Sequence, residues 1–216
     1  MTFIVGINIL FQLKVLNKWG HLMSELQIDV VDLLREQFPN GSHPLVNRHT
    51  GESLRRNIEE KLLQSPQATI AYLDFSRVEV IDFSCADEVV AKLVARLVGG
   101  EYGDRYIVLQ NISESHKENI EVALERKRLA VLGKQKGADW EILGVLNNYL
   151  RETLDFVVKQ CEVTARQMAE ILHIELNTSG TRLLNLYKAR LVVREERTMS
   201  PAGRQFVYRP ILSSPA

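Results

Sequence analysis

Short runs of apolar residues recur along this chain and lie well apart. Residues 68–75 read ATIAYLDF and residues 106–111 read YIVLQN. Runs of this length are typical of strands that are buried on both faces of a sheet. Further apolar runs at 28–34 (IDVVDLL), 129–133 (LAVLG) and 138–143 (ADWEIL) predict three more strands.

Between these runs the apolar positions recur with the period of a helix. Apolar residues spaced four apart predict an amphipathic helix over 50–63. Over 86–97 they fall at i, i+3, i+4, i+7, i+8 and i+11, which gives a second helix one buried face. A third helix follows a serine cap at Ser113 or Ser115. Strands that alternate with helices in this way indicate an α/β fold.

The segment DFSCADE, residues 82–88, gathers acidic and nucleophilic side chains just before the second helix. Ser84 followed by Asp87 three residues later fits a capping box, in which the serine is the N-cap and contributes about 1 kcal/mol. A catalytic role is not favoured, because a serine nucleophile needs a base and no histidine is close in sequence. Asp82 and Asp87 also lack the glycine-rich loop that accompanies Mg²⁺ in phosphate sites. We therefore expect no enzyme activity.

After about residue 143 the pattern changes to three helices followed by two strands. The order helix, helix-turn-helix, strand, polar loop, strand is that of a winged helix. Its third helix starts with small polar residues and an arginine, which suit entry into a DNA major groove. The residues that we expect to contact DNA are Asn177, Thr178, Ser179, Thr181, Arg182 and Asn185 on this helix, and Arg197 and Arg204 on the strand hairpin. Arg194 and Gln205 should also line this hairpin, or wing, where it meets the DNA backbone or minor groove.

Composition adds little to this picture, but the distribution of charge supports it. The chain has 27 basic and 27 acidic residues, with 45% hydrophobic and 25% charged residues, as in an ordinary globular protein. From residue 161 onward there are eight basic and five acidic residues, a modest excess that suits nucleic acid. Cys85 and Cys161 match no metal or redox spacing, so we expect reduced thiols, no metal site and no cofactor.

The N-terminal stretch FIVGINILFQLKVL is apolar but interrupted by Asn8, Gln12 and Lys14. It is too short and too polar to span a membrane, and it lacks the features of a secretory signal. The sequence MSELQIDVVDLL from Met23 is typical of a natural N-terminus. We therefore expect either that translation starts at Met23 or that the residues before it are a loosely attached extension. We expect a cytoplasmic protein with no membrane partner.

Two known families resemble the two parts of the chain. The segments LVNRHTGESLRRNIEEKL, YLDFSRVEVIDFSCADEVV and YIVLQN resemble STAS-like domains of unknown function, which are related to anti-sigma-factor antagonists. In those antagonists a partner kinase phosphorylates a serine, and the matching position here is Ser84. This chain has DFSCADE where the antagonists usually have a serine and a glycine. Residues 145–212, with RLLNLYKARLVVRE and GRQFVY, resemble the winged helix-turn-helix modules of prokaryotic transcription regulators.

Together these observations predict an α/β protein with a STAS-like sheet and helices plus a C-terminal winged-helix domain. We expect an extension over 1–23, a STAS-like domain over 24–142 and a winged helix-turn-helix domain over 143–216. The expected function is a DNA-binding transcription regulator with a STAS-like sensing or interaction domain. The alternative is a partner-switching module that binds a kinase-like ATPase. The partners expected are DNA, or a regulatory protein or kinase-like ATPase, with a homodimer also open.

Overall fold

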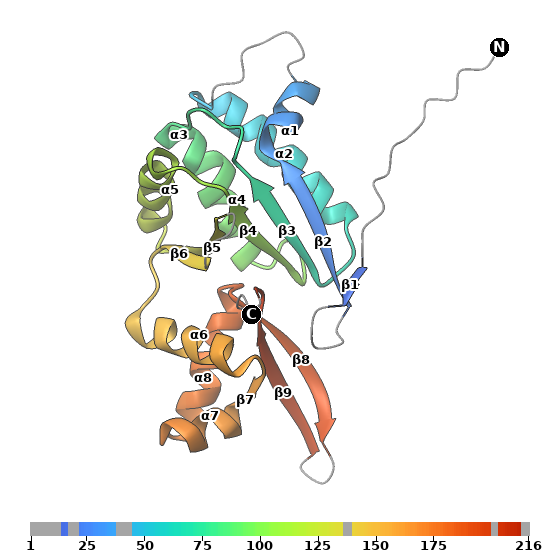
Figure 1. The fold of residues 1–216 in the computed structure, drawn as a ribbon, viewed down its shortest axis with the longest axis vertical. Helices are drawn as coiled ribbons and strands as arrows, with labels where there is room; N and C mark the ends of the chain where they lie inside the picture. The colour runs from blue at the N-terminus through green and yellow to red at the C-terminus, as the bar shows by residue number, and fades with distance from the viewer. Residues whose placement is uncertain (1–13, 17–21, 38–44, 136–139, 200–202, 213–216) are drawn as a thin grey trace, which may run out of the picture.

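The computed structural model describes residues 14–16, 22–37, 45–135, 140–199 and 203–212 (Figure 1). It shows a mixed α/β protein in which a mostly parallel sheet is followed by a smaller helical part with its own sheet. Among the described residues, no helix is both long and apolar enough to cross a membrane.

The larger sheet has six strands, and their spatial order follows their order in the sequence. The four central strands β2 to β5 are parallel, whereas β1 and β6 pair antiparallel at the two edges. The strands are β1 (Lys14–Leu16), β2 (Leu22–Asp29), β3 (Thr69–Asp74), β4 (Arg105–Gln110), β5 (Ala130–Lys134) and β6 (Trp140–Gly144). The strands expected at 68–75, 106–111, 129–133 and 138–143 are thus confirmed within a residue or two.

Helices connect the parallel strands. Because each strand lies beside the previous one, right-handed crossovers put all the connecting helices on one face of the sheet. The helices are α1 (Val30–Gln37), α2 (Arg48–Gln64), α3 (Phe83–Ala86), the π-helical turn η1 (Asp87–Ala91), α4 (Lys92–Val98) and α5 (Glu114–Arg126). Ser113 caps α5 in a capping box with His116, which confirms one of the two expected caps.

One expected strand is wrong. The run 28–34 divides at Asp29, where β2 ends and α1 begins. The Asp29 carboxylate accepts hydrogen bonds from the backbone N–H groups of Val31 and Asp32, at 2.9 and 3.1 Å, and so starts the helix.

Most of the expected N-terminal extension, residues 1–23, lies outside the described residues. Its last two residues belong to the sheet, because β2 begins at Leu22, and Met23 is buried.

The C-terminal part consists of three helices and a three-stranded antiparallel sheet, drawn from yellow to red in Figure 1. Its strand order is β7-β9-β8. The short β7 pairs only with part of β9, whereas β8 pairs with β9 along its whole length, and Figure 1 shows this long hairpin extending beyond the helices. Its elements are α6 (Asn148–Gln160), β7 (Val163–Thr164), α7 (Ala165–Leu172), α8 (Leu176–Lys188), β8 (Val192–Met199) and β9 (Gly203–Pro210).

The two parts share a hydrophobic core. Alternate residues of each central strand face opposite sides of the sheet. Ala71 and Leu73 of β3 belong to the core under helices α1 to α5, whereas Ile70 and Tyr72 belong to a second cluster. That second cluster continues into α6, α8, β8 and the residues after β9. The C-terminal part therefore covers the sheet face that the crossover helices leave open.

Arg190 adds a polar tie between the two parts. It follows the C-cap of α8 with a φ of 59°, in the left-handed region. Its Nη1 lies 3.2 Å from Asp104, its Nε lies 3.4 Å from the carbonyl of Leu97 at the end of α4, and its guanidinium lies over the ring of Tyr106. The end of α8 is thus fixed to the turn that joins α4 to β4.

Candidate nucleic-acid interface

Helix α8 presents a polar ridge on the outside of the C-terminal part. Leu183 and Leu186 are buried on its inner side. Asn177, Thr178 and Thr181 are exposed on its outer side, in its first two turns. The sequence therefore separates the packing face of this helix from a face with small hydrogen-bonding groups, as expected.

A groove of about 620 Å³ lies between α8, the start of α7 and the β8–β9 hairpin. None of the described residues that line it is acidic, and three of them are arginines. The lining residues used below are Arg166, Arg194, Arg204, Asn177, Thr181 and Phe206. The lining of the groove is therefore cationic, but carboxylates lie beside it. Glu196 lies 3.7 Å from Arg204 and pairs with Phe206 across the hairpin, and Glu170 and Glu175 line an adjoining hollow that shares Arg166 and Leu176 with the groove.

Arg194 is held in this groove by two aromatic rings. Its guanidinium carbon lies 4.2 Å from the ring centroid of Tyr187 on α8 and 4.3 Å from that of Phe206 on β9. Stacking of this kind fixes a guanidinium without neutralising its charge. Burial raises the pKa of the neighbouring Tyr208, so its phenol is neutral at pH 7 and adds no negative charge. The groove thus contains a pre-oriented cation.

A second, shallower hollow of about 480 Å³ lies on the other side of the α8 ridge, against the start of α6. Tyr149 and Asn185 line it together with Arg182, whose guanidinium carbon lies 5.5 Å from the Tyr149 ring centroid. Arg182 and Asn185 are half-buried, and Asn177, Thr178 and Thr181 also line this hollow. Five of the six expected helix residues therefore lie together on one surface.

Ser179, the sixth, is wrong as a DNA contact. It is fully buried, and its hydroxyl donates a hydrogen bond to the carbonyl of Ala165 at 2.7 Å. The side chain lies on the inner side of α8 and joins it to the first turn of α7. Ser179 therefore stabilises the angle between the two helices.

Arg204, one of the arginines expected on the wing, lines the groove, whereas Arg197 does not. Side chains alternate between the two faces of a strand, so Arg194 and Arg197, three residues apart, point to opposite faces of the hairpin. Arg197 donates to Glu162 at 2.9 Å and lies 3.4 Å from Glu195. Its partners hold it behind the hairpin.

Three residues of this surface were not among the expected contacts: Arg166, Phe206 and Tyr149. The period of a strand carried part of this signal, because Arg194, Arg204 and Phe206 fall on one face once the register of the hairpin is known. Arg166 and Tyr149 come from other helices. Their approach to α8 depends on tertiary packing, which local spacing does not report.

The DFSCADE segment differs from its expected form. The N-cap of α3 is Asp82, whose carboxylate accepts from the backbone N–H of Cys85 at 2.7 Å. Ser84 is therefore inside the helix and does not form a capping box with Asp87. Its side chain is half-buried, and no described residue hydrogen-bonds to its hydroxyl. Asp87 instead forms ion pairs with Lys127, at 2.8 Å, and Arg48, at 3.5 Å.

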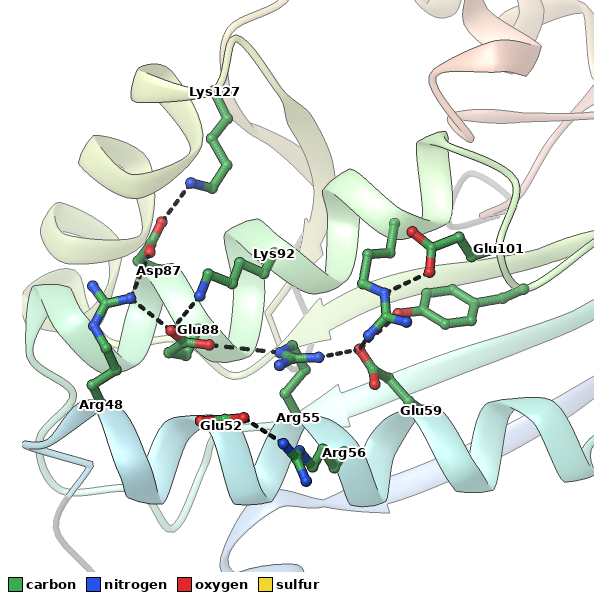
Figure 2. A network of polar contacts seen from close by, with 12 residues as sticks. Arg48, Glu52, Arg55, Arg56, Glu59, Asp87, Glu88, Lys92, Glu101 and Lys127 are labelled. Carbon is green, nitrogen blue, oxygen red and sulfur yellow. Dashed lines mark hydrogen bonds and ion pairs between the residues drawn. The ribbon is translucent and has the colours of Figure 1, made fainter.

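Glu88 lies at the centre of a buried ion network between α2 and η1 (Figure 2). Only 3% of its side chain is exposed, and it contacts Arg48 at 2.6 Å, Lys92, and Arg55 at 3.7 Å. Arg55 in turn contacts Glu59 at 2.6 Å. Asp87 and Glu88 are thus both paired with cations, and these ion pairs account for their positions in the structure.

Cys85, in the same DFSCADE segment, is buried and has an unreactive thiol. Burial, and the Asp82 carboxylate after it, raise the pKa of its thiol to about 11, so it is a neutral thiol at pH 7. The described residues contain no group of three or more histidine, cysteine or acidic side chains arranged to hold a metal ion.

No family model matches the chain, and no curated protein matches it.

Proposed function

We propose that this chain is a DNA-binding transcription regulator in which α6 to β9 form a winged helix and the α/β part is a STAS-like sensing or interaction domain. The observation that carries the proposal is the groove beside α8, which is lined by Arg166, Arg194 and Arg204 and by no acidic residue among those described. Phosphate contacts by arginine supply most of the affinity of proteins for DNA.

The shape of the surface supports the same function. A DNA major groove is about 12 Å wide, accepts one helix and is flanked by two phosphate backbones. The α8 ridge has a hollow on each side, with Arg194 and Arg204 in one and Arg182 in the other. A helix that enters the major groove would therefore meet a phosphate backbone with a cation on both of its flanks. Asn177 and Thr181 on the ridge would face the base edges.

The α/β part would act on α8 through the shared core. The second hydrophobic cluster includes both sheet residues and α8 residues, and Arg190 bonds the end of α8 to the turn after α4. A partner that alters the packing of α4 would therefore move α8. This arrangement supports a regulator whose front part controls the pose of the DNA-binding helix.

Selection of duplexes from a random pool, followed by a salt titration on the selected duplex, tests this function. We expect a preferred sequence and an affinity that falls steeply with salt, because several phosphates are neutralised. Arg182→Ala should weaken binding by about 1–3 kcal/mol if it contacts a guanine. The control is Arg151→Ala, an exposed arginine of α6 that lines neither hollow. No enrichment and no binding at low salt would refute the proposal.

One observation favours the alternative, a partner-switching module that binds a kinase-like ATPase. Asp82 caps α3 in place of Ser84, so the Ser84 hydroxyl is not engaged in the cap, and nearby Asp87 is paired with Lys127 and Arg48. A phosphate on Ser84 would then meet less repulsion than the sequence suggests. A phosphopeptide containing Ser84, together with an ATPase that binds Ser84→Ala but not Ser84→Glu, would support this function. Equal ATPase binding by both variants would refute it.

A further inference from the structure

The cationic groove also contains two large exposed apolar side chains, which phosphate binding does not require. Leu176 is 49% exposed and Phe206 is 45% exposed, and both line the groove with Arg166, Arg194 and Arg204. Phe206 has a contact that explains its position, because its ring packs on the guanidinium of Arg194. The exposure of Leu176 has no such explanation within the described residues.

Leu176 occupies a particular place on the surface. It is the first residue of α8, directly before Asn177, and it lines the groove at the tip of the ridge. A helix that enters a major groove N-terminus first would bring this side chain close to the base pairs. An apolar group on the ligand would bury this side chain and remove its apolar area from water, which favours binding.

Duplex DNA offers one apolar group in the major groove, the 5-methyl group of thymine. An apolar patch on a protein partner would satisfy Leu176 equally well. However, that partner would also have to place negative charge against three arginines in the same groove. Duplex DNA combines the phosphates and the methyl group at a fixed spacing.

We propose that Leu176 reads a thymine methyl group and so makes this chain select a duplex with thymine at one defined position. The inference rests on the proposed DNA-binding function and names the base that one residue of that surface recognises. Leu176 is then a specificity-determining residue, whereas Arg166, Arg194 and Arg204 supply affinity that does not depend on sequence.

The test replaces each thymine of the selected duplex in turn by deoxyuridine, which lacks only the 5-methyl group. Wild-type protein should lose affinity about fourfold at one position, the ratio that corresponds to about 0.8 kcal/mol for one buried carbon. Leu176→Ala should bind the thymine and deoxyuridine duplexes equally well. Ile171→Ala is the matched control, because Ile171 is 53% exposed but does not line the groove, and it should keep the fourfold difference.

Each other outcome has a distinct meaning. Equal binding of every deoxyuridine duplex by wild-type protein overturns the inference and leaves the DNA-binding function intact. A difference that persists in Leu176→Ala also overturns it, since the methyl group is then read elsewhere. Loss of a protein partner in Leu176→Ala with unchanged DNA recognition would overturn it too and assign Leu176 to protein docking. Failure of wild-type protein to bind any duplex refutes the proposed function itself.

Discussion

Replacing Glu88 by glutamine should destabilise the protein strongly, although the change is nearly isosteric. The carboxylate of Glu88 is 3% exposed and contacts the guanidinium of Arg48 at 2.6 Å, the amine of Lys92, and the Nε of Arg55 at 3.7 Å. Glutamine keeps the volume and removes the charge. Arg55, whose side chain is 10% exposed, would then depend on Glu59 alone.

The size of the loss follows from burial. Removing one partner of a buried ion pair costs about 3–5 kcal/mol, because the remaining charge stays out of water. Arg48 and Lys92 have side chains 53% and 38% exposed, so water recovers part of their interaction. We therefore expect the lower end of that range, about 3 kcal/mol. For a chain of this size that loss lowers the Tm by about 6–12 °C.

Thermal unfolding followed by circular dichroism, with urea unfolding as a second measurement, checks the prediction. The control is Glu52→Gln, which removes the partner of Arg56 from an exposed ion pair on α2 and should leave the Tm unchanged. A Glu88→Gln protein within about 1 kcal/mol of wild type would show that the network is hydrated and that its burial carries no cost.

Three further predictions concern other contacts. Arg190→Gly should increase hydrogen exchange both in the turn after α4 and at the end of α8, because one guanidinium bonds to both; exchange that rises in only one place would contradict this. In the native protein a thiol reagent should modify Cys161, which is partly exposed, before Cys85, whose pKa of about 11 keeps it protonated; equal rates would contradict the burial of Cys85. Tyr149→Ala should weaken DNA binding less than removal of Arg182 does, because it removes only the ring that orients the guanidinium, and an equilibrium titration measures the difference.

Much of the fold could be predicted because it depends on local pattern. The strands β3 and β4 are buried on both faces, so their apolar runs are nearly continuous and easy to identify. The run 28–34 failed because Val30, Val31, Leu33 and Leu34 fit one helical turn as well as a strand. Only the helix cap at Asp29 distinguishes the helix from the strand. An aspartate in a sequence does not by itself identify a helix cap, because aspartate also occurs in turns and loops.

The sequence predicted those residues of the candidate surface whose exposure follows from the helical period. Asn177, Thr178 and Thr181 lie on the outer side of an amphipathic helix, and the helical period is enough to find them. Ser179 was wrong because its partner, Ala165, is 14 residues away, and the ion pair of Arg197 with Glu162 joins residues 35 apart. Residues that bond at such separations are identified by tertiary structure, which local spacing does not contain.

The central claim is that the arginines of the groove beside α8 bind DNA phosphates. It is tested most directly by measuring how DNA affinity depends on salt when two of these arginines are replaced. The double variant Arg166→Gln, Arg204→Gln removes two exposed cations and leaves the stacked Arg194 in place. The slope of log affinity against log salt should become shallower by about two, because each of the two arginines would neutralise one phosphate. The control Arg35→Gln, Arg56→Gln, on the α/β part, should keep the wild-type slope. Equal slopes in all three proteins would contradict the account.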